Sequence, residues 1–169
     1  LDVGEGQAIL IQREGQGILI DTGHVGKARL VLDRVAALGV RQLDYLILTH
    51  LHPDHASGYF RLREAWPNTP LLFNGHPVSG LAQPDVTRWV YEALMTDPLA
   101  RVIRAGETIE WRGMQLEVLW PDGFANRNLN LHSLVIRLDY QEHTALIMGD
   151  AGKRVEQALL DQHNKLPSG

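Results

Sequence analysis

The chain has 169 residues, a length that suits one compact domain with a sizeable core. Its 44% hydrophobic content is that of a globular protein, and its net charge of −4 argues against a broadly basic surface, although a bound metal adds positive charge that this count omits. The absence of cysteine excludes disulfides, so any metal site depends on histidine, aspartate and glutamate.

The first half of the chain is predicted to combine short strands with helices. Apolar runs separated by glycines predict strands at residues 1–3, 8–11 and 18–20, and Asp21-Thr22-Gly23 forms a turn after the last of them. Helical spacing of apolar residues predicts a helix over residues 27–38. Residues 45–48 form a continuous apolar run, typical of a strand buried on both faces, which leads directly to His50.

A helix is expected over residues 54–66, followed by a buried strand at 71–73, a loop containing His76 and Gly80, and an amphipathic helix over 85–95. The second half is richer in strands, and its predicted elements are strands at 102–103, 108–111, 115–119, 134–138 and 144–148, a polar loop over 121–130 and a helix over 153–162. This order favours an α+β fold with two mixed sheets packed together and helices on their outer faces. A single doubly wound parallel sheet fits less well, because the strands of 102–119 are predicted to form antiparallel hairpins. No run of about 18 apolar residues predicts a transmembrane helix, and no signal peptide is recognisable.

The segment from His50 to His55 carries the strongest chemical signal. It reads His-Leu-His-Pro-Asp-His, and neutral imidazole and carboxylate are good ligands for zinc and manganese. In an extended segment residues two apart point to the same side, so His50 and His52 can bind one ion together. Pro53 bends the chain, and Asp54 and His55 then begin a helix and project toward a neighbouring position, so two ions side by side are geometrically natural. The alternative, a polar loop of capping and solvated histidines, explains a single histidine better than this cluster.

Asp150 is the next candidate ligand. It ends the apolar run at 144–148 through Gly149, where a carboxylate could bridge two ions. The alternative is an ordinary aspartate in a turn or at a helix cap, and that alternative stays open from the residue alone.

Together these residues resemble the metallo-β-lactamase fold superfamily of binuclear metallohydrolases. HLHPDH matches its HxHxDH motif, Gly149-Asp150 matches its bridging aspartate, and Ile20-Asp21-Thr22-Gly23 matches an early strand-turn element. LDVGEGQAILIQ, ILIDTG, LDYLILTHLHPDHASG and the run from Asn130 to Leu138 look like the branch that includes the C-terminal domain of the ComEC competence DNA-uptake channel. The resemblance covers essentially the whole chain.

The resemblance implies a four-layer αβ/βα sandwich of two mixed β-sheets flanked by helices, with the metal site at one edge. It implies that His50, His52 and His132 hold one ion, that Asp54 and His55 hold a second, and that Asp150 is shared. Asp54 is also the expected catalytic residue, orienting a metal-bound hydroxide. For His132 the alternative is a histidine at a strand edge that does not coordinate.

Two departures from the branch affect these expectations. Gln7 stands where the branch has an acidic residue in its GQGD motif. The family's last ligand, a histidine in an HHGS-like motif after the bridging aspartate, has no counterpart, since His163 lacks that context. We therefore expect residues 1–169 to be a single metallo-β-lactamase-like domain from a longer protein, lacking its first residues and its last strand-helix unit.

The expected function is metal-dependent hydrolysis, with Zn²⁺ or Mn²⁺, of phosphodiester or nucleic-acid substrates, DNA included. The rivals are hydrolysis of a small ester, thioester or lactam and, from another class, a catalytically impaired metal-binding module. Residues Asn126-Arg127-Asn128 are a possible phosphate contact, with a solvated loop as the alternative. The expected location is the cytoplasm for a stand-alone protein, and the cell surface or periplasm for a part of a competence channel.

Overall fold

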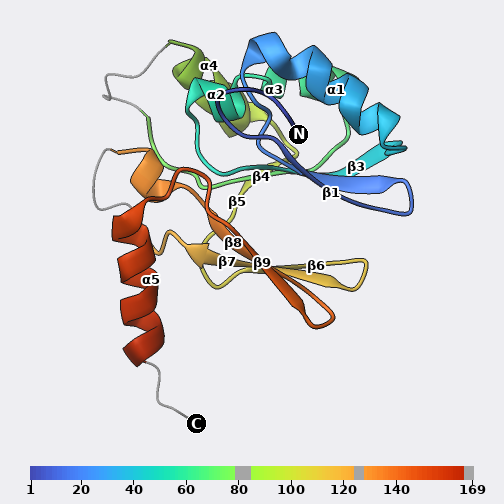
Figure 1. The fold of residues 1–169 in the computed structure, drawn as a ribbon. Coiled ribbons are helices and arrows are strands. Elements are labelled where there is room, and N and C mark those ends of the chain that lie inside the picture. Colours follow the sequence, from blue (N-terminus) through green and yellow to red (C-terminus); the bar gives the residue numbers. More distant parts are fainter. Residues whose placement is uncertain (79–84, 124–127, 166–169) are drawn as a thin grey trace. The chain divides into compact units, whose positions relative to one another are not determined.

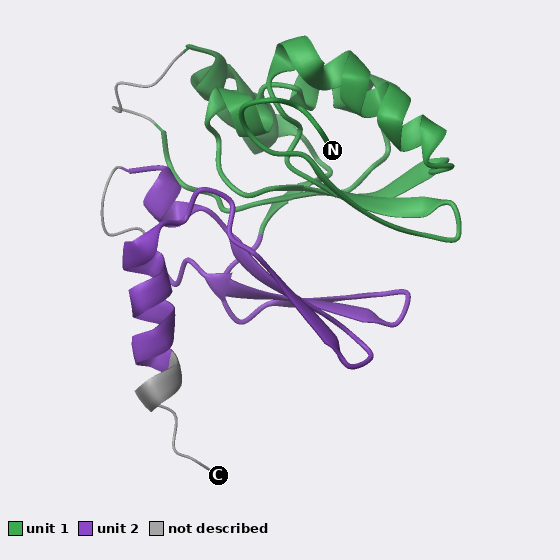
Figure 2. Ribbon diagram, in the orientation of Figure 1, with its two compact units in different colours: residues 1–102 green, residues 103–169 purple. Residues whose placement is uncertain are grey.

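The computed structural model divides the chain into two compact units, Leu1–Val102 and Ile103–Gly169 (Figure 2). It describes residues 1–78, 85–123 and 128–165, with the side chains of the last helix described to residue 162. Within these residues no helix is both long and apolar enough to cross a membrane. The single domain expected from the length stays a prediction, because the structure determines each unit by itself.

The first unit is built on a five-stranded mixed sheet with the order β1-β2-β3-β4-β5 (Figure 1). Its strands are Ile9–Arg13 (β1), Gln16–Ile20 (β2), Gln42–Leu48 (β3), Leu71–Phe73 (β4) and Ala100–Val102 (β5). β1 and β2 form an antiparallel hairpin, whereas β2 to β5 are parallel neighbours. The antiparallel pairing expected for residues 102–103 is therefore wrong, because β5 pairs with β4 in parallel.

Four helices lie along one face of this sheet (Figure 1). They are Ala28–Ala37 (α1), Pro53–Ala56 (α2), Tyr59–Ala65 (α3) and Asp85–Thr96 (α4), and the 3₁₀ turn η1, Val25–Lys27, precedes α1. From β2 to β5, each new strand is added at the same edge of the sheet. Connections between parallel strands are right-handed, so helices in successive connections lie on the same face of the sheet. The buried residues of α1 and α4, such as Val31 and Leu94, are the apolar positions that gave these helices their predicted amphipathic spacing.

The continuous helix expected over residues 54–66 is wrong in one respect, because the chain breaks into α2 and α3 at Ser57-Gly58. The Gly58 N–H donates to Oγ1 of Thr22 at 3.1 Å instead of continuing a helix from α2. A Cβ at Gly58 would lie 2.8 Å from the Thr22 carbonyl oxygen, so this close approach requires glycine. The break thus arises from contact with the turn after β2, which local sequence does not encode.

The strand expected at residues 1–3 is also wrong, since the chain before β1 has no strand pairing. Gly4 and Gly6 have φ values of 75° and 88°, which produce a loop rather than an extended edge. The Leu1 nitrogen lies 2.7 Å from the Ala8 carbonyl oxygen and closes this loop.

The second unit is built on a four-stranded sheet with the order β6-β7-β8-β9, antiparallel throughout (Figure 1). Its elements are Thr108–Trp111 (β6), Met114–Trp120 (β7), the 3₁₀ turn Asn130–His132 (η2), Val135–Tyr140 (β8), His143–Ile147 (β9) and Lys153–Lys165 (α5). Val155 of α5 packs with Val135 and Ala151 in a small apolar cluster. This cluster attaches the last helix to the sheet.

Candidate metal centre

The segment that follows β3 lies at the carboxyl end of a parallel strand, where α/β sheets commonly place ligand sites. Leu46, Ile47 and Leu48 are at most 3% exposed, which fixes the end of β3. The Asn74 side-chain amide, next to the end of β4, donates to the Thr49 carbonyl oxygen at 3.2 Å. The segments that follow β3 and β4 are therefore hydrogen-bonded to each other directly before His50.

Three imidazole rings converge directly after this strand. Nε2 of His50 lies 3.0 Å from Nδ1 of His52, and the ring centroids of His50 and His55 are 4.2 Å apart. His50 is fully buried, His55 is nearly so, and His52 is half-buried at the rim. The predicted cluster is thus brought together within the first unit, with His52 at the extended residue before α2.

Asp54 and His55 occupy the first turn of α2. Asp54 Oδ2 lies 3.8 Å from Nε2 of His55, and the Asp54 side chain is 41% exposed. Pro53 at the start of α2 turns the chain between His52 and this pair. Asp54 is therefore the solvent-facing carboxylate of the group, beside Nε2 of His55.

A buried carboxylate, Asp21, underlies the imidazole cluster. Its Oδ2 lies 2.7 Å from Nδ1 of His55 and accepts a hydrogen bond of 2.7 Å from the Thr49 hydroxyl, while its Oδ1 accepts from the Thr49 N–H at 2.7 Å. Since Nδ1 of His55 faces this carboxylate, it carries the proton, which leaves the lone pair on Nε2, the nitrogen 3.8 Å from Asp54 Oδ2. A carboxylate behind a histidine in this way orients the ring and raises its basicity toward a metal.

The Asp21 carboxylate is buried but accepts several hydrogen bonds. Burial raises the pKa of the Asp21 carboxyl above its ordinary 3.8, and the hydrogen bonds from His55 and Thr49 oppose that rise. The residue also has a φ of 60°, a left-handed conformation that is uncommon outside glycine. The sequence analysis placed Asp21 in a turn and gave it no role. The available signal was its position directly after an apolar strand, the same signal that pointed to His50.

Gln7 was also given no role, and the structure places it at the junction of three segments. Its side-chain amide donates to Oδ2 of Asp21 at 3.0 Å. Its N–H donates to the Asp54 carbonyl oxygen at 3.3 Å, and its carbonyl accepts from the Gly23 N–H at 2.8 Å. The neutral amide supplies a donor to Asp21, which an acidic residue would not supply when ionised.

The loop before Gln7 packs tightly against Asp54. A Cβ on Gly6 would lie 2.0 Å from the Asp54 carbonyl oxygen, whereas a Cβ on Gly4 would meet nothing within 4 Å. Both glycines have positive φ, which costs an L-residue about 1–2 kcal/mol. We expect Gly6→Ala to lower the free energy of unfolding by about 1–3 kcal/mol more than Gly4→Ala does, because only Gly6→Ala creates a clash. Urea denaturation of both variants measures this difference, and equal losses would contradict the packing described here.

His50 makes the metal-free chain sensitive to acid. Burial, then the nearby charges of His55 and His52, lowers the pKa of His50 from 6.5 to about 2. Because the pKa is depressed in the folded state, the contribution of His50 to stability is complete above pH 6.5 and is lost as the pH falls toward about 2. Between those limits the unfolded chain binds the proton that the folded chain resists, which costs up to about 1.4 kcal/mol per pH unit. Urea titrations in EDTA should show this slope below pH 6.5, and His50→Asn should make it shallower. An unchanged slope in that variant would contradict the prediction.

His132 and Asp150, the other predicted ligands, lie in the second unit. His132 is buried at the end of η2, and Asp150 is exposed in the turn that follows β9. The Asp150 N–H donates to Oγ of Ser133 at 3.3 Å, so the two candidates lie near each other within this unit. Of the residues considered for phosphate contact, Asn126 and Arg127 lie outside the described residues.

The donor set of the first unit fits a divalent transition metal. Imidazole nitrogens and a carboxylate are ligands for zinc and manganese, and the chain contains no cysteine thiolate. The close contact between Nε2 of His50 and Nδ1 of His52 brings together two ring nitrogens that can both donate lone pairs to one ion. The fixed tautomer of His55 adds a third nitrogen that faces Asp54.

The chain is similar to several known proteins. The family described as the Metallo-beta-lactamase superfamily matches residues 1–168. "Recombination protein 2" of Haemophilus influenzae is 33% identical over 93% of the chain and 18% of its own length, and "Competence protein ComA" of Neisseria gonorrhoeae is 30% identical over 96% and 21%. "Hydroxyacylglutathione hydrolase" of Aeromonas salmonicida is 30% identical over 93% of the chain and 53% of its own length. The chain therefore spans about a fifth of the first two relatives and about half of the third.

Solved structures show the same fold. A subclass B3 metallo-beta-lactamase from a soil metagenome library, MEM-A1, superposes with a TM-score of 0.61 over 83% of this chain and 55% of its own, at 18% identity. The predicted α+β fold of two sheets with flanking helices is thereby confirmed.

Proposed function

The chain belongs to the metallo-β-lactamase superfamily, and we propose that it is a metal-dependent hydrolase domain that cleaves phosphodiester bonds in nucleic acid. The observation that carries the proposal is the close approach of His50 to both His52 and His55. Asp54 lies beside His55, and the buried Asp21 bonds to the same histidine from behind. A buried carboxylate and a histidine with a fixed tautomer have no evident use in a merely solvated loop. They are the usual means by which proteins orient a metal-binding imidazole.

The proposed ligands are those that the sequence singled out. His50 and His52, with His132, would hold one Zn²⁺ or Mn²⁺ ion, Asp54 and His55 would hold a second, and Asp150 would be shared. Within the first unit the nitrogens of His50 and His52 already lie at contact distance. His132 and Asp150, which lie in the second unit, are included because of their positions in the sequence of the family.

The chemistry follows from the side chains present. When bound, a metal ion here polarises the substrate oxygen and lowers the pKa of water toward neutrality. Asp54, exposed on the rim, accepts the proton of the attacking water and orients its lone pair. His55 stays in the tautomer that Asp21 imposes, so its lone pair is on Nε2. His50, whose pKa is depressed to about 2, keeps its lone pair at neutral pH.

The choice of substrate is supported by the relatives. Two of them are named as recombination and competence proteins, and we take these names to favour a nucleic-acid substrate. The rival is hydrolysis of a thioester or another small acyl substrate, and the relative named hydroxyacylglutathione hydrolase favours it. A domain that binds metal without catalysis is the alternative from a different class.

One panel of substrates separates these functions. We expect the chain loaded with zinc or manganese to hydrolyse bis-p-nitrophenyl phosphate and to cleave a short single-stranded oligonucleotide, with little activity on a thioester or a lactam. Hydrolysis of the thioester or the lactam without the phosphodiester would overturn the proposed substrate. Inertness toward the whole panel, with metal demonstrably bound, would favour the binding module.

A further inference from the structure

A pocket in the first unit opens beside Asp54. It has a volume of about 340 Å³, and its polar lining consists of Glu5, His24 and Lys27 together with Asp54. Because Asp54 is one of the proposed ligands, a group that enters this pocket lies next to the bond to be cleaved. A volume of this size accommodates a small chemical group or part of a larger ligand.

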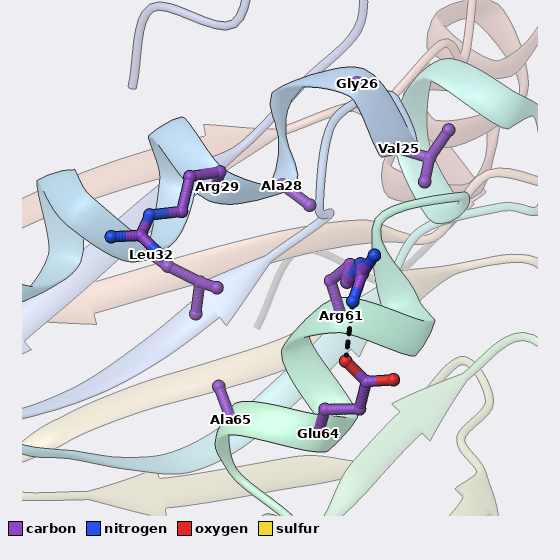
Figure 3. A pocket seen from close by; sticks show the side chains of 8 residues that line it. All are labelled: Val25, Gly26, Ala28, Arg29, Leu32, Arg61, Glu64 and Ala65. Carbon is purple, nitrogen blue, oxygen red and sulfur yellow. Dashed lines mark hydrogen bonds and ion pairs between the residues drawn. The ribbon is translucent and has the colours of Figure 1, made fainter.

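A second pocket adjoins the first at the η1 turn, because Gly26 lines both. It has a volume of about 530 Å³ and lies between α1 and α3. Figure 3 shows Arg29 on α1 and Arg61 on α3, with Arg61 bonded to Glu64. A path therefore runs from the candidate metal centre, past η1, to two guanidinium groups.

The cations along this path are available to a ligand. Lys27 forms no ion pair with a carboxylate among the residues that the structure describes. Arg29 pairs with Asp33 at 3.0 Å and Arg61 with Glu64 at 3.1 Å, and in both pairs more than half of each side chain is exposed. Exposed pairs of this kind contribute little to stability, so an incoming phosphate can displace them at little cost. Arginine also matches the geometry of phosphate oxygens with two parallel donors.

His24 adds a neutral donor at the same turn. Its Nδ1 accepts a hydrogen bond from the Gly26 N–H at 3.1 Å, so the neutral ring carries its proton on Nε2. The ring is exposed and lines the first pocket. His24 can therefore donate to an anionic oxygen beside Lys27 without needing to be protonated.

We propose that the two pockets form one phosphate track for single-stranded nucleic acid. Lys27 and His24 bind the phosphate next to the one being cleaved, and Arg61 and Arg29 bind the phosphate that follows. A single strand is the fitting ligand because its backbone can bend around a three-residue turn, whereas a duplex stays stiff over about 150 base pairs. The track rests on the proposed function, since it takes a phosphodiester as the substrate.

The proposal is tested by the salt dependence of binding, which measures the number of phosphate contacts and does not require catalysis. The probe is a fluorescein-labelled oligothymidylate with phosphorothioate linkages, which resist cleavage, titrated with the zinc-loaded chain at several salt concentrations. Each phosphate contact with a single strand contributes about 0.7 to the slope of log K against log salt. We expect Lys27→Gln and Arg61→Gln each to reduce the slope by about 0.7 and to weaken binding several-fold at low salt, and the double variant to lose about twice as much slope. Lys27→Arg should restore the wild-type slope.

Arg34→Gln is the matched control, because Arg34 is an exposed cation on α1 that lines neither pocket. Its slope should equal that of the wild type. Slopes for Lys27→Gln and Arg61→Gln that coincide with the control would overturn the track. Failure of the zinc-loaded wild type to hydrolyse bis-p-nitrophenyl phosphate would instead overturn the proposed function, so the two failures are distinguishable.

Discussion

Replacing His52 by alanine should abolish hydrolysis while leaving the fold intact. His52 is half-buried at the rim of the site, and its side chain caps no helix, so the variant should unfold at nearly the wild-type temperature. Its Nδ1 lies 3.0 Å from Nε2 of His50, and these are the two nitrogens proposed to bind one ion. Loss of a direct ligand removes several kcal/mol of stabilisation of the transition state, which corresponds to a fall of at least about 10³-fold in kcat/KM.

Metal content and rate are measured together for this variant, after dialysis against zinc. The control is His143→Ala, since His143 is an exposed histidine on β9, in the second unit. We expect the control to retain wild-type metal and activity. If His52→Ala kept both its zinc and its rate, the cluster after β3 would not be the reacting centre.

The second large effect is expected at Asp21. Asp21→Ala would leave the Thr49 N–H, the Gln7 amide and Nδ1 of His55 without their buried acceptor. Each buried donor that loses its acceptor costs about 1–3 kcal/mol, so the free energy of unfolding should fall by several kcal/mol. Urea denaturation of this variant measures the contribution of the Asp21 carboxylate to the free energy of unfolding.

Asp21→Asn separates orientation from stability. The asparagine fills the same space, but its amide nitrogen cannot accept from Nδ1 of His55. We expect a smaller loss of stability together with a fall of about 10–100-fold in metal affinity, the usual effect of removing a residue that orients a ligand. Isothermal titration with zinc gives the affinity, and Asp161→Asn, on the exposed face of α5, is the control. Unchanged affinity in Asp21→Asn would show that His55 needs no such orientation.

Much of the first sheet could be predicted from the sequence, because its strands have distinctive local patterns. The continuous apolar run before His50 predicted a buried strand, and residues 42–48 form β3. The pairing of β5 could not be predicted, since a three-residue strand does not encode its partner. The break between α2 and α3 was also hidden, because it depends on Thr22, more than thirty residues away in the sequence.

The candidate site divides in the same way. His50, His52, Asp54 and His55 are consecutive in a recognisable motif, so the sequence analysis found them together. Gln7 and Asp21 reach His55 only through tertiary contacts across the turn after β2 and the loop before β1. A single aspartate or glutamine in such a position has many ordinary uses, so its role becomes visible only when its partners are known.

The measurement that tests metal binding by the histidine cluster most directly is X-ray absorption at the zinc edge of the zinc-loaded chain. We predict nitrogen and oxygen ligands at about 2.0–2.1 Å, the distances typical of zinc bound by histidine and carboxylate. The outer-shell scattering should require at least two imidazole rings per ion and should weaken in His52→Ala. A first shell of oxygen alone, with no imidazole scattering, would contradict the assignment of His50, His52 and His55 as the metal-binding core.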